Sequence, residues 1–97
     1  MKKGCYLIFL LVCILTACST NMETRKRKAE DRRNVAVAYM DQGNYTEALR
    51  ELIEAEKLYA DDPYLQSDLG FVYMQKGKLG LAIKHFTRAL ELKPDFS

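Results

Sequence analysis

Residues 29–96 hold two successive copies of one 34-residue pattern, and this repeat is the feature that most constrains the fold. The identical pairs, when residues 29–62 are laid over residues 63–96, are Tyr39 and Tyr73, Met40 and Met74, Gly43 and Gly77, Ala48 and Ala82, Ala55 and Ala89, Leu58 and Leu92, and Asp61 and Asp95. A fixed period of this length is typical of helical units that stack into a solenoid. Each unit therefore has to bury its apolar side chains against its neighbours.

The second copy has the spacing of two amphipathic helices joined by a turn. Pro63 suits the first position of a helix, where its missing N–H would have no partner anyway, and Asp62 can cap the free amides there. Gly77 ends this first helix. Apolar residues then recur at intervals of three and four until Pro94, which predicts a second helix over this stretch.

The first copy repeats this arrangement, with Gly43 between its two helices. Asn44, followed three residues later by Glu47, resembles a capping box at the start of the second helix. The chain shows no alternating pattern typical of strands and few β-branched runs. We therefore expect an all-α fold.

The repeat resembles the tetratricopeptide repeat family. Residues at the family's signature positions are Leu69, Gly70, Tyr73, Ala82, Phe86, Ala89 and Pro94 in the second copy, and Val35, Ala36, Tyr39, Ala48, Leu52 and Ala55 in the first. Small residues at six of these positions fit the resemblance, because helices approach closely only where side chains are short. It implies tandem helix-turn-helix units, repeat 1 over 29–62 and repeat 2 over 63–96. The chain departs from the family at Arg32 and Gln66, where an aromatic residue is common.

In this family the first helix of each unit lines a concave groove for peptides or helices of partner proteins. Carried over by position, the partner-binding groove consists of Arg33, Val37, Met40 and Asp41 from repeat 1 and of Tyr64, Ser67, Phe71, Met74 and Gln75 from repeat 2. Methionine adapts to varied shapes and aromatic rings supply anchoring area, so the groove suits apolar segments. The alternative is that Phe71 and Met74 belong to the packing between repeats.

The last helix is expected to leave an apolar flank that includes Ile83, Phe86 and Leu90. Solenoids generally need three or more units, because each unit buries its face only against neighbours. We therefore expect either a longer protein in which further repeats follow or a module that pairs with itself or with another chain. The first of these is favoured.

The N-terminus has the layout of an export signal, with lysines at positions 2 and 3 ahead of the uncharged run 5–17. This run is shorter than the roughly 20 apolar residues of a membrane-spanning helix. The sequence LTAC at residues 15–18 resembles the bacterial lipobox, whose cysteine receives a diacylglyceryl group. The resemblance implies a signal peptide over residues 1–17 and lipidation at Cys18; the alternative for Cys18 is an ordinary thiol.

Residues 18–28 are expected to form the lipidated cysteine and a charged tether. The chain has 15 Lys and Arg against 13 Asp and Glu, and because two lysines precede Cys18, the remainder has 13 of each. This balance argues against nucleic acid as a partner, which would require a basic patch. The cations of Arg25–Lys28 leave two interpretations open. They contact anionic lipid headgroups beside the anchor, or they belong to a solvated tether.

Catalysis is not supported by the sequence. The only histidine, His85, falls on the polar side of a predicted helix, and we expect it to be a surface residue. No phosphate-binding loop and no metal-ligand spacing occur. Acidic and basic residues alternate at helical spacing between Glu47 and Lys57, which favours a paired, solvated face. We expect no catalytic residue, no cofactor, no metal and no small-molecule substrate.

The sequence therefore predicts a membrane-anchored scaffold that mediates protein–protein interaction in the bacterial cell envelope. The absence of Asp next to Cys18 favours, by resemblance to enterobacterial sorting, the periplasmic face of the outer membrane. The layout is similar to that of the pilotin lipoproteins that assist assembly of a pilus or secretion complex. The alternative is a self-associating structural lipoprotein of the envelope without a peptide-binding groove.

Overall fold

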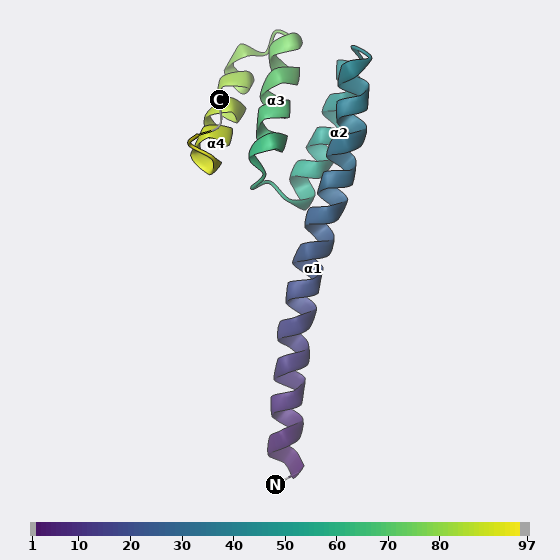
Figure 1. Ribbon diagram of the computed structural model, residues 1–97, viewed down its shortest axis with the longest axis vertical. Coiled ribbons are helices and arrows are strands. Elements are labelled where there is room, and N and C mark those ends of the chain that lie inside the picture. Colours follow the sequence, from purple (N-terminus) through teal and green to yellow (C-terminus); the bar gives the residue numbers. More distant parts are fainter. Residues whose placement is uncertain (1, 96–97) are drawn as a thin grey trace.

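The protein is a bundle of helices with one long helical extension. The computed structural model describes residues 2–95, with the side chains of residues 3–15 and 21–95. Its helices are α1 (Lys2–Asp41), α2 (Tyr45–Leu58), α3 (Pro63–Gln75) and α4 (Leu79–Leu92), and no strand occurs in this range. The prediction of an all-α fold is confirmed. Figure 1 shows α2 and α3 beside the C-terminal half of α1, with α4 beyond α3.

Helix α1 is continuous from the N-terminal segment into the first repeat. The expected tether at residues 18–28 is part of this helix, whose N-terminal half extends away from the other helices (Figure 1) and gives the molecule a length of 65 Å. The side chains of residues 16–20, that of Cys18 included, lie outside the described residues, so lipidation at Cys18 stays a prediction. Within the described part of the chain, no helix combines the length and the apolar character needed to cross a membrane.

The turns between the two helices of each unit have the same structure. Gly43 and Gly77 adopt positive φ values of 73° and 75°, which L side chains rarely adopt. In both turns the glycine N–H and the next N–H donate to carbonyls of the preceding helix, as in a Schellman motif. The bonds are Gly43 to Met40 at 2.9 Å, Asn44 to Tyr39 at 2.9 Å, Gly77 to Met74 at 3.0 Å and Lys78 to Tyr73 at 2.8 Å.

Of the two N-terminal caps predicted from the sequence, the one at the start of α3 is present and the one at the start of α2 is not. The Asp62 side chain accepts a hydrogen bond of 2.9 Å from the Tyr64 N–H, and Pro63 is the first residue of α3, as predicted. The capping box at Asn44 is wrong, because the Asn44 side chain makes no capping bond. Its N–H is already donated to the turn that ends α1, and Glu47 accepts from Arg50 at 3.1 Å instead.

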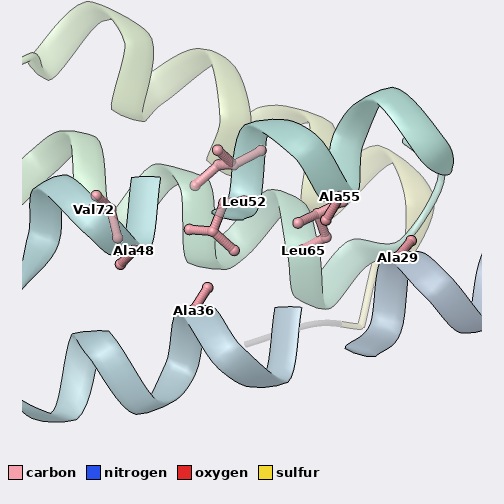
Figure 2. Close-up of a cluster of buried hydrophobic side chains, with 8 residues drawn as sticks. Ala29, Ala36, Ala48, Leu52, Ala55, Leu65 and Val72 are labelled. Atoms are coloured by element: carbon pink, nitrogen blue, oxygen red, sulfur yellow. The ribbon is translucent and has the colours of Figure 1, made fainter. Parts of the chain in front are cut away.

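The core is formed where α2 is enclosed between α1 and α3. Its buried side chains, most of them labelled in Figure 2, are Ala29, Ala36, Ala48, Leu52, Ala55, Leu65, Leu69 and Val72. The small residues expected to allow close helix approach, at positions 36, 48, 55, 70, 82 and 89, are all buried. The most demanding contact is at Gly70, where an added Cβ would lie 2.7–2.9 Å from ring carbons of Phe86.

Candidate partner-binding surface

The predicted groove residues all lie on α1 and α3, and we call the surface they form the α1–α3 face. Asp41, Tyr64, Met74 and Gln75 are exposed; Arg33, Val37, Met40, Ser67 and Phe71 are half-buried. Helices α1 and α3 also contact each other directly. The fold therefore brings the two sets of predicted residues to neighbouring helices.

An ion pair joins the two helices across this face. Arg33 Nε donates to Asp68 Oδ2 over 2.7 Å, and both side chains are largely shielded from solvent. Burial raises the pKa of Asp68 above its usual value, although the charge and the hydrogen bond of Arg33 act in the opposite direction. Asp68 was not among the predicted groove residues, because nothing in its sequence spacing links it to an arginine 35 residues earlier.

Two cations flank the aromatic ring of Tyr64. The guanidinium carbon of Arg33 and the ammonium nitrogen of Lys93 each lie 5.4 Å from the ring centroid, within the range of a cation–π contact. Lys93 also donates to the Tyr64 hydroxyl at 3.3 Å. The ring is nevertheless 47% exposed. The sequence analysis identified Tyr64 and Arg33 but missed Lys93, which follows α4 and reaches the face only through the fold.

Of the predicted groove residues Met40, Phe71 and Met74, the first two pack against the core and the third is exposed. Met40 and Phe71 pack against the core, and the Phe71 ring meets the Tyr45 ring edge-on at 6.1 Å. Met74 leaves 43% of its surface exposed. Phe71 thus contributes to the contact between repeats, whereas Met74 and Tyr64 present accessible apolar surface on the α1–α3 face.

The prediction that His85 is a surface residue is wrong. Only 8% of His85 is exposed, its Nδ1 lies 2.7 Å from Gln66 Oε1, and its ring stacks on that of Tyr73 at 5.4 Å. The cause lies in Gln66, one of the departures from the family pattern, because this buried amide supplies the polar partner that a buried imidazole needs. Burial lowers the pKa of His85, and the nearby Glu56 carboxylate opposes this effect.

The hydrogen bonds of Gln66 fix the protonation of His85. The Gln66 amide nitrogen donates to Glu56 Oε2 and to the Ala60 carbonyl, each at 2.9 Å. Both of its hydrogens are used, so Oε1 faces the histidine and can only accept. His85 Nδ1 must therefore carry the proton. Among the described residues, no buried side-chain nitrogen or oxygen lacks a partner, those of this network included.

Two surface clefts lie away from the α1–α3 face. One, of about 480 Å³, is lined mainly by α4 residues and by Glu56 and Gln66; the other, of about 680 Å³, lies between α1 and α2 and includes Arg32 and Glu51. In the part of the chain that the structure describes, no three His, Cys, Asp or Glu side chains are arranged to hold a metal ion. Mutually paired charges, Arg50 with Glu47 and Lys57 with Glu54, cover the outer side of α2 as predicted.

Family models match the part of the chain that contains α2, α3 and α4. A TPR repeat model matches residues 37–77, and a tetratricopeptide repeat model matches residues 63–96. The chain carries tetratricopeptide repeats. Proteins built from these repeats generally act as scaffolds that bind other proteins through the extended surface of the solenoid.

Two curated proteins similar to this chain are the mitochondrial import receptor subunit TOM70 of two Saccharomyces cerevisiae strains, YJM789 and ATCC 204508 / S288c. Each is 35% identical over 75 residues, which are 71% of this chain but only 12% of the relative. The chain therefore spans a small part of the length of these relatives.

Proposed function

We propose that the protein is a membrane-anchored tetratricopeptide scaffold that binds a protein partner on its α1–α3 face in the bacterial cell envelope. The observation that carries the proposal is the exposure of Tyr64 and Met74 near the two ends of α3, nearly three turns apart on a rigid repeat. Exposed aromatic and methionine side chains on a fixed backbone are well suited to bind an apolar segment. The similar yeast proteins are named import receptor subunits, which agrees with a repeat that receives another protein.

The anchor in this proposal is a lipid on Cys18 after removal of residues 1–17. Its support is the LTAC motif together with the apolar side chains of α1, which are 41–68% exposed from Tyr6 to Leu15 and need a non-aqueous environment or removal. Two or more acyl chains give stable membrane residence. We further propose the periplasmic face of the outer membrane and a role, like that of pilotins, in assembling a pilus or secretion complex.

Site-specific photocrosslinking in the native host tests the proposed surface. A photoreactive residue at Met74 should give one discrete protein adduct, and Tyr64→Ala should remove it. The matched control is Thr87, which is also exposed but lies on α4 among the residues of the 480 Å³ cleft. Equal adducts from positions 74 and 87 would contradict a partner bound on the α1–α3 face.

The anchor is tested separately. Cys18→Ala should move the protein from the membrane fraction to the soluble fraction, or leave it with an uncleaved N-terminus. Membrane retention of a processed Cys18→Ala protein would exclude the lipid anchor. This result would leave the photocrosslinking test unaffected, because that test reports on the repeats.

A second candidate is a self-associating structural lipoprotein, and it is favoured by the outer face of α4. Leu79, Ile83 and Leu90 are 62%, 66% and 49% exposed, and with Phe86 between them they have the three-and-four spacing of a helix–helix seam. Phe86 is half-buried at the edge of this seam, because its ring also packs against Gly70 of α3. A seam of this kind can pair with the same seam on a second copy. Sedimentation velocity decides between the candidates: a monomer whose size does not depend on concentration supports the scaffold, and a dimer abolished by Ile83→Lys supports self-association.

Neither candidate uses catalysis, a cofactor, a metal or nucleic acid. The titratable groups whose pKa values are shifted by burial, Asp68 and His85, are each bonded to a structural partner, Arg33 and Gln66. Such bonds explain the burial of these groups without a reaction. The proposal is accordingly a binding function.

A further inference from the structure

Four consecutive cations surround α1 at the level where it leaves the repeats. Arg25, Lys26, Arg27 and Lys28 are all exposed, and Ala29, the next residue, is buried in the core. Successive residues of a helix are turned by about 100°. The four side chains therefore point in different directions around the helix axis. We call Arg25–Lys28 the cationic collar.

The structure attaches the collar to the end of the repeats instead of leaving it on a loose tether. Arg25 donates to the carbonyl oxygen of Lys57 in the last turn of α2 at 3.3 Å, a favourable position for a cation because helix carbonyls there lack partners. The Lys26 ammonium lies 4.9 Å from the centre of the Tyr59 ring. The collar thus has a fixed position at one edge of the body.

Within the described part of the chain, no carboxylate forms an ion pair with a cation of the collar. The other four arginines, at positions 32, 33, 50 and 88, each lie within 3.3 Å of a carboxylate. Arg25 bonds to a backbone carbonyl instead, and Arg27 has neither a hydrogen bond nor an ion pair with another described residue. Glu23 offsets one charge, which leaves an excess of three over residues 23–28, and Glu30 and Asp31, the next acidic residues along α1, reduce the excess to one over residues 23–31. The excess is therefore concentrated at the collar, which favours an anionic partner outside the chain.

The position of the collar favours a membrane surface as that partner. Arg25 lies eight residues after Ala17, the last residue of the expected signal peptide, which is about 12 Å along a helix. The polar headgroup region on each side of a bilayer is about 5–8 Å thick. An apolar segment or a lipidated Cys18 held in the membrane therefore places the collar within about one Debye length, 8–10 Å, of the headgroups.

We propose that the cationic collar binds anionic phospholipid headgroups and thereby holds the collar end of the repeats against the bilayer surface. This inference rests on the proposed anchoring at the N-terminus. It adds the class of lipid that is bound, an anionic phospholipid, and the orientation of the two repeats relative to the membrane. Because α1 is one continuous helix, the seated collar makes the repeats stand upright, with the turns at Gly43 and Gly77 farthest from the membrane (Figure 1).

The test measures binding of the full-length chain to two kinds of vesicle, phosphatidylcholine alone and phosphatidylcholine with phosphatidylglycerol. The reported quantity is the ratio of the two affinities, which cancels the contribution of the apolar segment. Each cation near an anionic surface contributes about a fivefold change in affinity, so Arg27→Gln with Lys28→Gln should lower the ratio by about 25-fold. Rising salt should bring the wild-type ratio toward one.

The matched control is Lys76→Gln with Lys78→Gln, which removes the same charge at the turn between α3 and α4. There the ratio should change by less than about threefold, because the turn lies at the far end of helices about 20 Å long, two to three Debye lengths from the collar edge. Circular dichroism of both double variants should be unchanged, since all four side chains are exposed. Equal losses in both variants, or no loss in the collar variant, would overturn the proposal.

Two further outcomes separate this proposal from others. A failure of the anchor lowers binding to both vesicles and leaves the ratio intact, so it is distinguishable from a failure of the collar. A soluble polyanion is the competing partner class. If Arg27→Gln with Lys28→Gln weakened binding to heparin or polyglutamate while the vesicle ratio stayed constant, the collar would be a site for an acidic macromolecule and the membrane proposal would be wrong.

Discussion

Equivalent positions of the two repeats have different surroundings. The comparison shows that the repeat pattern determines the helices, whereas the neighbouring helix determines which side chains are buried. Tyr45 and Leu49 of repeat 1 are half-buried because α3 packs beside them, whereas their equivalents Leu79 and Ile83 in repeat 2 are 62% and 66% exposed. The helix pair has the same form in both units. Exposure follows instead from whether another helix lies alongside.

A second pair of equivalent positions shows the same rule for polar residues. Arg32 and Glu51 form an exposed ion pair of 3.0 Å in repeat 1, and the residues 34 positions later, Gln66 and His85, form a buried hydrogen bond of 2.7 Å. Both bonds join the first helix of a unit to its second helix. A neutral pair replaces the charged pair where the site is buried between repeats, in line with the high cost of burying unpaired charge.

The largest expected effect contrasts the enclosed and the open second helix. Leu52→Ala should lower the free energy of unfolding by about 2–5 kcal/mol, because Leu52 is fully buried and the substitution leaves a cavity. Ile83→Ala should cost less than about 0.5 kcal/mol at its exposed site. Urea unfolding monitored by circular dichroism measures both. A cost at Ile83 close to that at Leu52 would show that the outer face of α4 is covered in solution.

The next prediction concerns the contact between the helices of each unit. Gly70→Ala should destabilise the protein by about 1–2 kcal/mol, because the new Cβ would lie 2.7–2.9 Å from the Phe86 ring. Alanine is the better helix former by about 1 kcal/mol, so steric crowding must exceed that gain for the sign to hold.

Repeat 1 supplies the matched rescue for this substitution. It has Ala36 and Leu52 at the positions equivalent to Gly70 and Phe86. The double variant Gly70→Ala with Phe86→Leu should therefore lose less unfolding free energy than the two single variants lose together. The expected difference is about 1 kcal/mol. Strictly additive losses in the double-mutant cycle would mean that the crowding at Gly70 comes from another contact.

How much of this could be predicted from sequence depends on whether a signal is local, within one helix or one turn, or joins residues on different helices. The Asp62 cap, the glycine turns and the small residues at the helix contacts are set by local spacing, and the sequence analysis identified them. The burial of His85 depends on Gln66 in the preceding helix, and the contact of Lys93 with Tyr64 depends on the fold. The Glu47 half of the capping box is absent because the turn ending α1 uses the Asn44 N–H that Glu47 would have accepted.

A smaller effect on the free energy of unfolding is expected from the buried pair of Gln66 and His85, and it should depend on pH. Burial lowers the pKa of His85 below its usual 6.5, so the folded protein favours the neutral ring. The contribution of His85 to stability is complete above pH 6.5 and is lost as the pH falls from 6.5 toward the lower pKa of the folded state. His85→Gln keeps a donor for Gln66 but cannot titrate.

Unfolding of the wild type and of His85→Gln should therefore be compared at about pH 8 and about pH 5, on either side of the ordinary histidine pKa. The stability of the wild type relative to the variant should be lower at the acid pH. Other ionisations cancel in this difference. A difference that did not change with pH would mean that His85 titrates alike in the folded and unfolded protein.

The smallest effect is expected at the exposed pair of repeat 1. Arg32→Gln removes the bond to Glu51, but the Arg32 side chain is 51% exposed, and ion pairs of this kind contribute no more than about 1 kcal/mol. The loss should shrink further in high salt, which screens exposed charges. If Arg32→Gln instead cost as much as Gly70→Ala and resisted salt, the Arg32 site would be enclosed in solution, and equivalent positions in the two repeats would share one environment after all.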